Sequence, residues 1–218
     1  MGASPKKIDL GKGIALDLPA EYDFLAMPEA GKFMESMGNL YNENLLGLVA
    51  GRAEDSPWFI TLRYDEDGYV KDDESVDGDD LLEEMRDSLP DVNEERQEQG
   101  LPALSIDGWD EPPHYDKGNH HLVWCLRVSD KESSSANYNT RVLGRKGHVS
   151  INLVIEPARV ATDKPHALAL LKATQFVSGS RSSVSARRSR SCSRAQRLRP
   201  SSREQKNSAA PRKKHSPK

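Results

Sequence analysis

The sequence predicts an α+β domain built on a single antiparallel sheet flanked by helices. Three observations carry this prediction. Short stretches with an apolar residue at every second position recur between residues 8 and 155, and this pattern is typical of half-buried strands. Turn-forming residues separate several of these stretches closely enough to make hairpins. Stretches with apolar residues three or four positions apart lie between and after the strands, and they predict helices.

The first part of the chain predicts three strand regions and one short helix. Pro28 suits the first turn of a helix because its fixed φ is already helical. Trp58–Tyr64 alternates strictly, so its large apolar residues share one face. The predicted elements are one or two strands within residues 8–18 around Gly11–Gly13, a short helix that Pro28 opens and that stops before Gly38, and strands at Asn44–Ala50 and Trp58–Tyr64.

The second part predicts two helices and two hairpins. Pro90 should kink or split the first of these helices, and Asp163 is a plausible N-cap of the second. The predicted elements are a helix at Asp79–Gln99, a strand at Ile106–Glu111, a turn at Asp116–Asn119 with a return strand at His121–Val128, a hairpin of Tyr138–Leu143 with His148–Ile155, and a helix at Pro165–Phe176.

Charge divides the chain near residue 177. Residues 177–218 carry a net charge of +12, whereas residues 1–176 carry −15. The basic segment holds 12 Ser among its 42 residues and almost no large apolar side chains, so it cannot bury enough surface to offset the cost of ordering it. We therefore expect a disordered N-terminus at residues 1–7, one domain at residues 8–176, and a disordered Ser/Arg-rich basic tail at residues 177–218.

Three interpretations of the tail remain open. It can be out-of-frame or foreign sequence, because GC-rich DNA read in the wrong frame gives such a mixture of Arg, Ser, Ala and Pro. It can be a solvated linker. It can also be a nucleic-acid-binding arm, because Arg187–Arg199 and Arg212–Lys214 are dense in cations that neutralise phosphates. The acidic domain would repel phosphates, which counts against a nucleic-acid role.

Composition and motifs exclude several classes of protein. We expect this chain to lack a signal peptide and a transmembrane segment, because no apolar run approaches the ~18 residues that a span needs. Two cysteines exclude a disulfide scaffold. No motif for a nucleophile, a phosphate loop or a zinc protease is present, so an enzyme is disfavoured and no cofactor is expected. The groups His114, His120, His121 and Cys125 do not converge along a strand as zinc ligands must.

A partial calcium-binding loop lies in the acidic segment at the start of the helix predicted at Asp79–Gln99. Its residues at loop positions 1, 3, 5 and 12 are Asp73, Ser75, Asp77 and Glu84, with Gly78 at position 6. Asp80 stands where the motif has an apolar residue, and no helix is predicted before the loop. The alternative is a helix N-terminus rich in carboxylates that complement its dipole. Calcium binding is therefore kept as an alternative hypothesis.

The segment Gly108–Asp116 is the most unusual of the chain. Pro112 and Pro113 cannot donate to a sheet, so this segment must lie at a sheet edge or leave the sheet. One hypothesis is a surface that docks a partner; the alternative is that Trp109 and Tyr115 pack over the end of the sheet. The hypothetical binding surface comprises Trp109, Pro112, Pro113, Tyr115, Arg141 and Arg145.

Several segments together resemble one protein family. They are Leu16–Pro19 with Tyr22–Phe24, Leu62–Val70, Leu81–Met85, Asn93–Arg96, Gly108–Asp116, Leu122–Trp124, Asn137–Asn139 and Arg141–Gly147. Their order and spacing resemble DUF2167, a bacterial family described as predicted membrane-anchored proteins of unknown function, over residues 8–176. The order of predicted elements is also loosely similar to that of PsbP, an antiparallel sheet between helices that binds partners at a membrane surface.

The resemblance implies an extracytoplasmic domain at the inner membrane of a bacterium, and it brings no known catalytic residues. We therefore expect a non-enzymatic interaction module with a protein partner at the membrane surface. The alternatives are a calcium-dependent module through Asp73–Glu84 and a soluble protein whose basic tail binds nucleic acid.

Overall fold

The computed structural model describes residues 4–52, 57–66, 77–116 and 121–177. The chain divides into two units, residues 1–183 and 184–218, and every described residue belongs to the first. Its elements, in chain order, are β1 (Lys6–Gly11), β2 (Ile14–Leu18), β3 (Tyr22–Ala26), α1 (Glu29–Ser36), β4 (Leu45–Gly51), β5 (Phe59–Asp65), α2 (Gly78–Glu98), β6 (Ser105–Asp116), β7 (His121–Ser129), β8 (Ser134–Leu143), β9 (His148–Ile155), a 3₁₀ turn (Pro157–Arg159), α3 (Val160–Ala173) and β10 (Thr174–Phe176).

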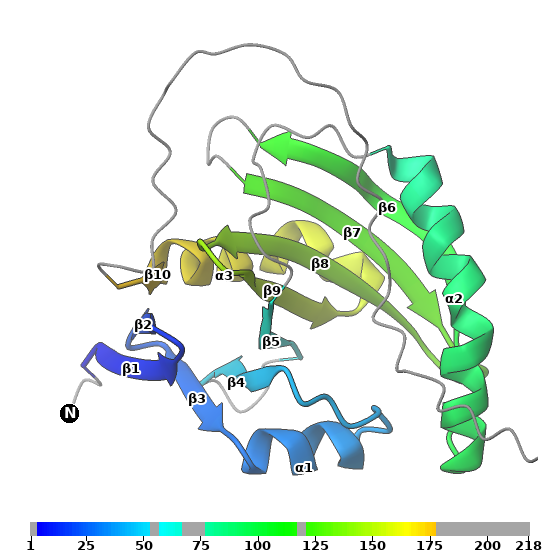
Figure 1. The fold of residues 1–218 in the computed structure, drawn as a ribbon, viewed down its shortest axis with the longest axis horizontal. Coiled ribbons are helices and arrows are strands. Elements are labelled where there is room, and N and C mark those ends of the chain that lie inside the picture. Colours follow the sequence, from blue (N-terminus) through cyan, green and yellow to red (C-terminus); the bar gives the residue numbers. More distant parts are fainter. Residues whose placement is uncertain (1–3, 53–56, 67–76, 117–120, 178–218) are drawn as a thin grey trace, which may run out of the picture. The chain divides into compact units, whose positions relative to one another are not determined.

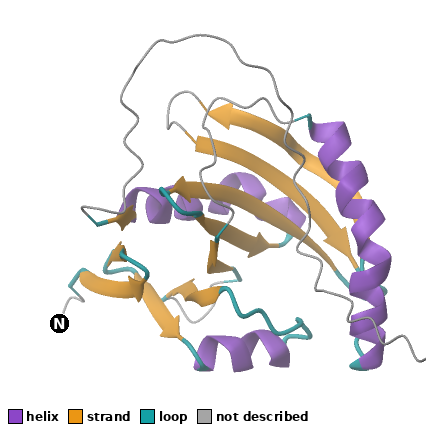
Figure 2. Ribbon diagram, viewed as in Figure 1, coloured by secondary structure: helices purple, strands orange, loops and turns teal. Residues whose placement is uncertain are grey.

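Most of the strands form one antiparallel sheet. Its order is β3-β4-β5-β9-β8-β7-β6, and a second sheet has the order β1-β2-β10 (Figures 1 and 2). Two runs of consecutive strands, β3-β4-β5 and β6-β7-β8-β9, meet where β5 pairs with β9 along seven residue pairs. The predicted class, α+β with an antiparallel sheet flanked by helices, is confirmed, and the structure adds the small second sheet.

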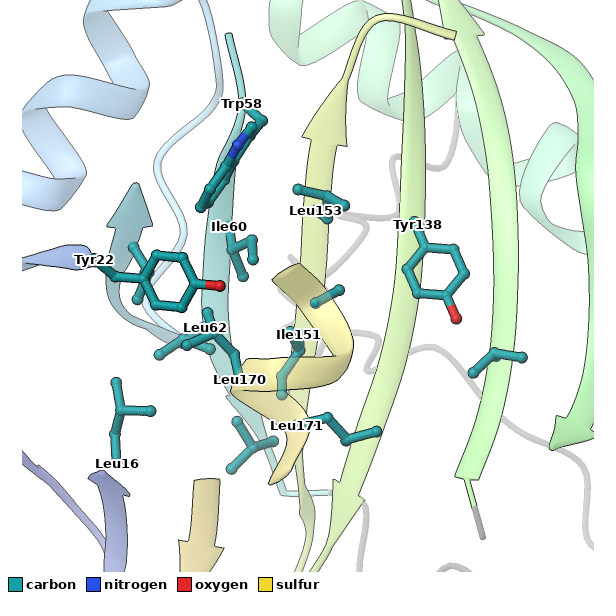
Figure 3. Close-up of a cluster of buried hydrophobic side chains, with 14 of the residues drawn as sticks. Leu16, Tyr22, Trp58, Ile60, Leu62, Tyr138, Ile151, Leu153, Leu170 and Leu171 are labelled. Carbon is teal, nitrogen blue, oxygen red and sulfur yellow. The ribbon is translucent and has the colours of Figure 1, made fainter. Parts of the chain in front are cut away.

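One face of the large sheet carries the core and is covered by α3. Ile60 and Leu62 on β5 pair with Leu153 and Ile151 on β9, and all four are fully buried. Leu170 and Leu171 of α3 pack into the same cluster (Figure 3). Figure 1 shows α3 behind β8 and β9, the two strands on which it packs most. We call this side of the sheet the α3 face.

The opposite face of the sheet carries α1 and α2. Ala30 of α1 packs with Leu45 and Leu48 of β4 in a small separate cluster. The pairing of β4 with β5 places these two leucines on the side away from α3. At the other edge, the Arg86 side chain of α2 donates to the Ile106 carbonyl of β6 at 3.2 Å. The two helices therefore lie on the same face, over opposite edges of the sheet.

The small sheet closes one end of the core. Ile14 and Leu16 of β2 are buried in the main cluster, and β10 pairs with both. The Phe176 ring of β10 packs directly on the backbone of Gly144, where a Cβ atom would lie 2.5 Å from the ring. This position therefore requires glycine.

The sequence located most elements correctly, and the end of the domain differs. The helix predicted at Pro165–Phe176 is α3, which begins at Val160 and ends at Ala173. Asp163 is not its N-cap: it is buried inside the first turns and forms an ion pair with Arg159 at 2.8 Å. The last three predicted helical residues form β10 because pairing with β2 stabilises an extended backbone there.

The limits of other elements can also be compared with their predicted limits. The assignment of α2 runs through Pro90 without a break, so the proline does not split this helix. β1 begins at Lys6, two residues before the predicted start of the domain. The predicted tail after residue 177 and the turn residues 117–120 lie outside the described residues.

Within the described part of the chain, every helix is too short or too polar to cross a bilayer.

Two adjacent residues of β9 test which face of the large sheet carries the core. Leu153→Ala should destabilise the domain by about 3 kcal/mol, since it deletes buried methyl groups from a packed core. Val154→Ala, the matched control on the half-buried opposite face, should cost less than about 1.5 kcal/mol. Urea unfolding followed by tryptophan fluorescence measures both. Equal losses would contradict the two-faced sheet.

Candidate functional site

The segment predicted to dock a partner forms the edge strand β6. Its pairing with β7 is interrupted three times, between Ile106 and Gly108, between Trp109 and Glu111, and between Glu111 and His114. Pro112 and Pro113 fall within the last interruption, where no backbone donor is needed. This confirms the prediction that the two prolines lie at a sheet edge.

Trp109 holds the N-terminus of α2. Its indole Nε1 donates to the carbonyl of Gly78, the first residue of α2, at 3.0 Å. A Cβ atom on Gly78 would lie only 3.1 Å from Cδ of Pro113, so the helix start is seated closely on this segment. For Trp109, the packing interpretation is the better supported of the two.

Tyr115 and Arg141 lie on the same sheet face as Trp109. Tyr115 pairs with Leu122 of β7. The next residue of β7, Val123, pairs with Thr140, the residue before Arg141 on β8. Tyr115 and Arg141 therefore stand in one row across β6, β7 and β8. The Arg141 guanidinium lies over the Trp124 ring, 4.9 Å from its centroid. Arg145 is exposed in the turn between β8 and β9. That these residues form a partner surface stays a prediction.

The calcium hypothesis requires a loop at residues that form a helix in the structure. α2 begins at Gly78, so loop positions 6 to 12 are all helical. The Asp77 carboxylate caps this helix by accepting from the amides of Asp79 and Asp80, and Glu84 lies on the helix itself. Asp73 and Ser75 lie outside the described residues. The described geometry does not favour a calcium site, and the metal hypothesis stays untested.

The histidines and the cysteine near β7 do not form a metal centre in the described part of the chain, where no group of three suitable ligands converges. Cys125 is fully buried. Burial, aided by the charges of Asp110 and Glu111, raises the pKa of its thiol to about 12. A thiol held in its protonated form is a poor nucleophile.

Sequence reasoning missed a cluster of Asp65, His148 and Ser150 at the junction of β5 and β9. Ser150 Oγ donates to Asp65 Oδ2 at 2.9 Å. His148 Nε2 lies 3.1 Å from Ser150 Oγ and 3.4 Å from Asp65 Oδ2. Hydrogen bonding to His148, with smaller help from the charge of Arg63 and from Ser150, outweighs burial and lowers the pKa of Asp65 to about 2.

This cluster is not arranged as a catalytic triad. In a triad, the carboxylate orients one ring nitrogen and the other nitrogen takes the serine proton. Here the single nitrogen Nε2 faces both partners, and Ser150 donates directly to Asp65. His148 is also 1% exposed, so a substrate has no direct access to its ring. The geometry indicates a buried polar cluster that ties β5 to β9.

Two polar atoms beside this cluster lack a partner. Both atoms are buried. Among the described residues, Arg63 Nε donates no hydrogen bond and Asn152 Oδ1 accepts none. Asn152 does use its amide nitrogen, which donates to Asn137 Oδ1 at 3.3 Å. A buried polar group without a partner costs about 1–3 kcal/mol, so native structures keep few of them. No motif could have revealed these two positions, since the alternation of the strands shows only that both face away from the core.

The fold and these residues define an α+β domain whose large sheet is apolar under α3 and polar in the middle of its other side. The family model described as "Protein of unknown function (DUF2167)" matches residues 2–184, and the chain belongs to this family. The solution structure of cyanobacterial PsbP (CyanoP) from Synechocystis sp. PCC 6803 is similar, with 12% identity and a TM-score of 0.47 over 80% of this chain and 93% of that chain. No curated protein matches the chain.

The carboxylate of Asp65 should make the stability of the domain depend on pH. Its pKa is lower in the folded state than in the unfolded chain, so its stabilisation is present above pH ~4 and is lost as the pH falls toward 2. The loss should be about 2 kcal/mol. Asp65→Asn should remove this part of the slope, measured by urea unfolding between pH 5 and pH 2.

The matched control for this substitution is Asp23→Asn, which changes an exposed carboxylate paired with Arg52. It should leave the pH dependence as in the wild type, because exposed ion pairs contribute little. An unchanged slope in Asp65→Asn would contradict the role of the cluster.

Trp109→Phe should separate packing from docking at the edge strand. It keeps an aromatic ring but removes the bond to Gly78, so it should lower the stability of the domain by about 1 kcal/mol. Tyr41→Phe, at a side chain that is 64% exposed, is the control and should change nothing. Thermal unfolding measures both. If Trp109→Phe leaves the stability unaltered, the indole does not hold α2.

Proposed function

We propose that this domain is a non-enzymatic interaction module, the extracytoplasmic part of a membrane-anchored bacterial protein, and that it recognises a protein partner at the membrane surface. The location follows from what the family resemblance implies. The recognition surface is the end of the sheet where β6 stops, with Tyr115 and Arg141 on the face away from α3 and Arg145 in the adjoining turn.

One observation carries this proposal: β6 is an edge strand whose backbone is unsuited to pairing with another strand. Three interruptions and two prolines break its row of donors, and such features protect an edge from strand addition. A partner must therefore contact side chains. Pro112 and His114 are exposed on this strand, and Arg145 and Lys146 are exposed at the same end of the sheet.

The polar cluster supports a binding function over catalysis. Its serine and histidine both serve the Asp65 carboxylate, so neither is prepared to attack a substrate. The buried Cys125 is held as a thiol. These groups stabilise the sheet on which the proposed surface is built.

Site-specific photo-crosslinking in the native bacterium tests the partner surface. A photoreactive residue at Pro112 or Arg145 of the full-length protein should give one adduct of discrete mass. The control position is Lys32, which is exposed on α1. Equal crosslinking from all three positions, or none from Pro112 and Arg145, would sink the proposed surface.

The location has its own readout in the same cells. Lys32→Cys, made in a Cys192→Ser background, should react with a membrane-impermeant maleimide in intact spheroplasts, since Cys125 is buried. Labelling that appears only after lysis would place the domain on the other side of the membrane and overturn the extracytoplasmic proposal.

A further inference from the structure

The middle of the large sheet has a polar side. On β5, β9 and β8 the residues that face α3 are mostly apolar, whereas most of those that alternate with them are polar. We call this set of side chains the polar face; it comprises Thr61, Arg63, Asp65, Asn137, Asn139, Arg141, His148, Ser150 and Asn152.

The polar face is not simply the solvated side of a sheet. His148 and Ser150 are buried, and Arg63, Asn139 and Asn152 are only partly exposed. A solvated face would pair its polar atoms with water, but Arg63 Nε and Asn152 Oδ1 are shielded from it. Groups of this kind persist where they serve a function that compensates their cost.

The two unpaired atoms are close and complementary. Arg63 pairs across the sheet with Ser150, and Asn152 is the next residue of β9 on the same face. Such diagonal neighbours lie about 7–8 Å apart, so one small ligand can span both side chains once neighbouring side chains move aside and uncover the two shielded atoms. The Arg63 atom is a cationic donor and the Asn152 atom is an acceptor. A ligand that satisfies both must therefore offer an acceptor and a hydrogen side by side.

Charge selects among such ligands. Arg63 and Arg141 both pair with Ser150, one from each side of β9, so two guanidinium groups flank one position of the polar face. The carboxylate of Asp65 already accepts from Ser150 and lies beside His148. The polar face thus has more positive than negative charge, within a segment whose net charge is −15. Guanidinium groups favour carboxylates and phosphates, whose paired oxygens match their geometry.

We propose that the polar face binds an oxyanion that also carries a hydroxyl hydrogen. Arg63 donates to an oxygen of the anion, and the hydroxyl of the ligand donates to Asn152 Oδ1. Hydrogen phosphate and a sugar acid share this chemistry. This site is separate from the proposed partner surface, although Arg141 borders both.

Four probes separate charge from the hydroxyl requirement. The full chain is titrated at constant ionic strength with inorganic phosphate, D-glucuronate, sulfate and D-glucose at neutral pH, and amide and side-chain shifts are followed by ¹H–¹⁵N NMR. Phosphate or glucuronate should give saturable shifts on β5, β8 and β9. Sulfate lacks the hydrogen and glucose lacks the charge, so both should bind at least about tenfold more weakly. Whichever of the first two binds identifies the source of the chemistry.

Variants assign the binding to the two unpaired atoms. Arg63→Met and Asn152→Leu should weaken binding of the better probe by at least about tenfold. Binding is the deciding readout, because both variants should lose some stability: Asn152→Leu removes the hydrogen bond from its amide to Asn137, and Arg63→Met removes a charge that helps to keep Asp65 ionised. A variant that is destabilised but binds the probe as the wild type does would contradict the assignment. Arg52→Met, which changes an arginine paired with Asp23 outside the polar face, is the matched control and should bind as the wild type does.

Asn152→Asp keeps the size of the side chain and serves if either apolar variant fails to fold. Its carboxylate should repel the anion and abolish the shifts. The proposal is overturned if none of the four probes gives saturable shifts, if sulfate or glucose binds as tightly as phosphate and glucuronate, or if Arg52→Met weakens binding as much as Asn152→Asp does.

Discussion

The pairing of β5 with β9 is the constraint on which the rest of the domain depends. It joins a run of three strands to a run of four that starts 40 residues later in the chain, and α3 packs across the strands at this junction. Because side chains alternate strictly along a strand, fixing this register fixes the face of every residue on both sides. A shift of one position would turn Ile60 and Leu62 outward and place Arg63 in the core.

The same register creates the polar side of the sheet. With Leu153 and Ile151 committed to the core, their neighbours Asn152 and Ser150 must face away from it. Most antiparallel sheets expose such residues to water on one face. Here His148 and Ser150, in the middle of that face, are buried, so they depend on neighbouring side chains for hydrogen bonds. The bonds among Asp65, His148 and Ser150 are the consequence.

The sequence was sufficient for most of the strands, although it did not reveal β3 or β10, and it was insufficient for the contacts between strands. Alternation in Trp58–Tyr64 and His148–Ile155 identified both strands and their core faces, because burial on one side leaves a period of two in the residue pattern. It could not show that β5 pairs with β9, and so it could not bring Asp65 to Ser150, 85 positions away. The limits of α3 were missed for a related reason. Asp is a residue type favoured at helix N-caps, but here Asp163 lies inside the helix, where its carboxylate pairs with Arg159.

The overall charge of the domain and the charge of its polar face act at different ranges. Salt screens charges separated by more than about 8–10 Å, so carboxylates beyond that distance act only weakly on the polar face. Arg63 and Arg141 act at contact distance on a partly shielded surface, where water weakens their attraction much less. An acidic domain can therefore hold an anion tightly while slowing its approach, and rising salt should speed association with little effect on the bound contacts. The net charge of residues 1–176 therefore predicts repulsion of phosphates at long range and does not determine what one face of the sheet binds at contact distance.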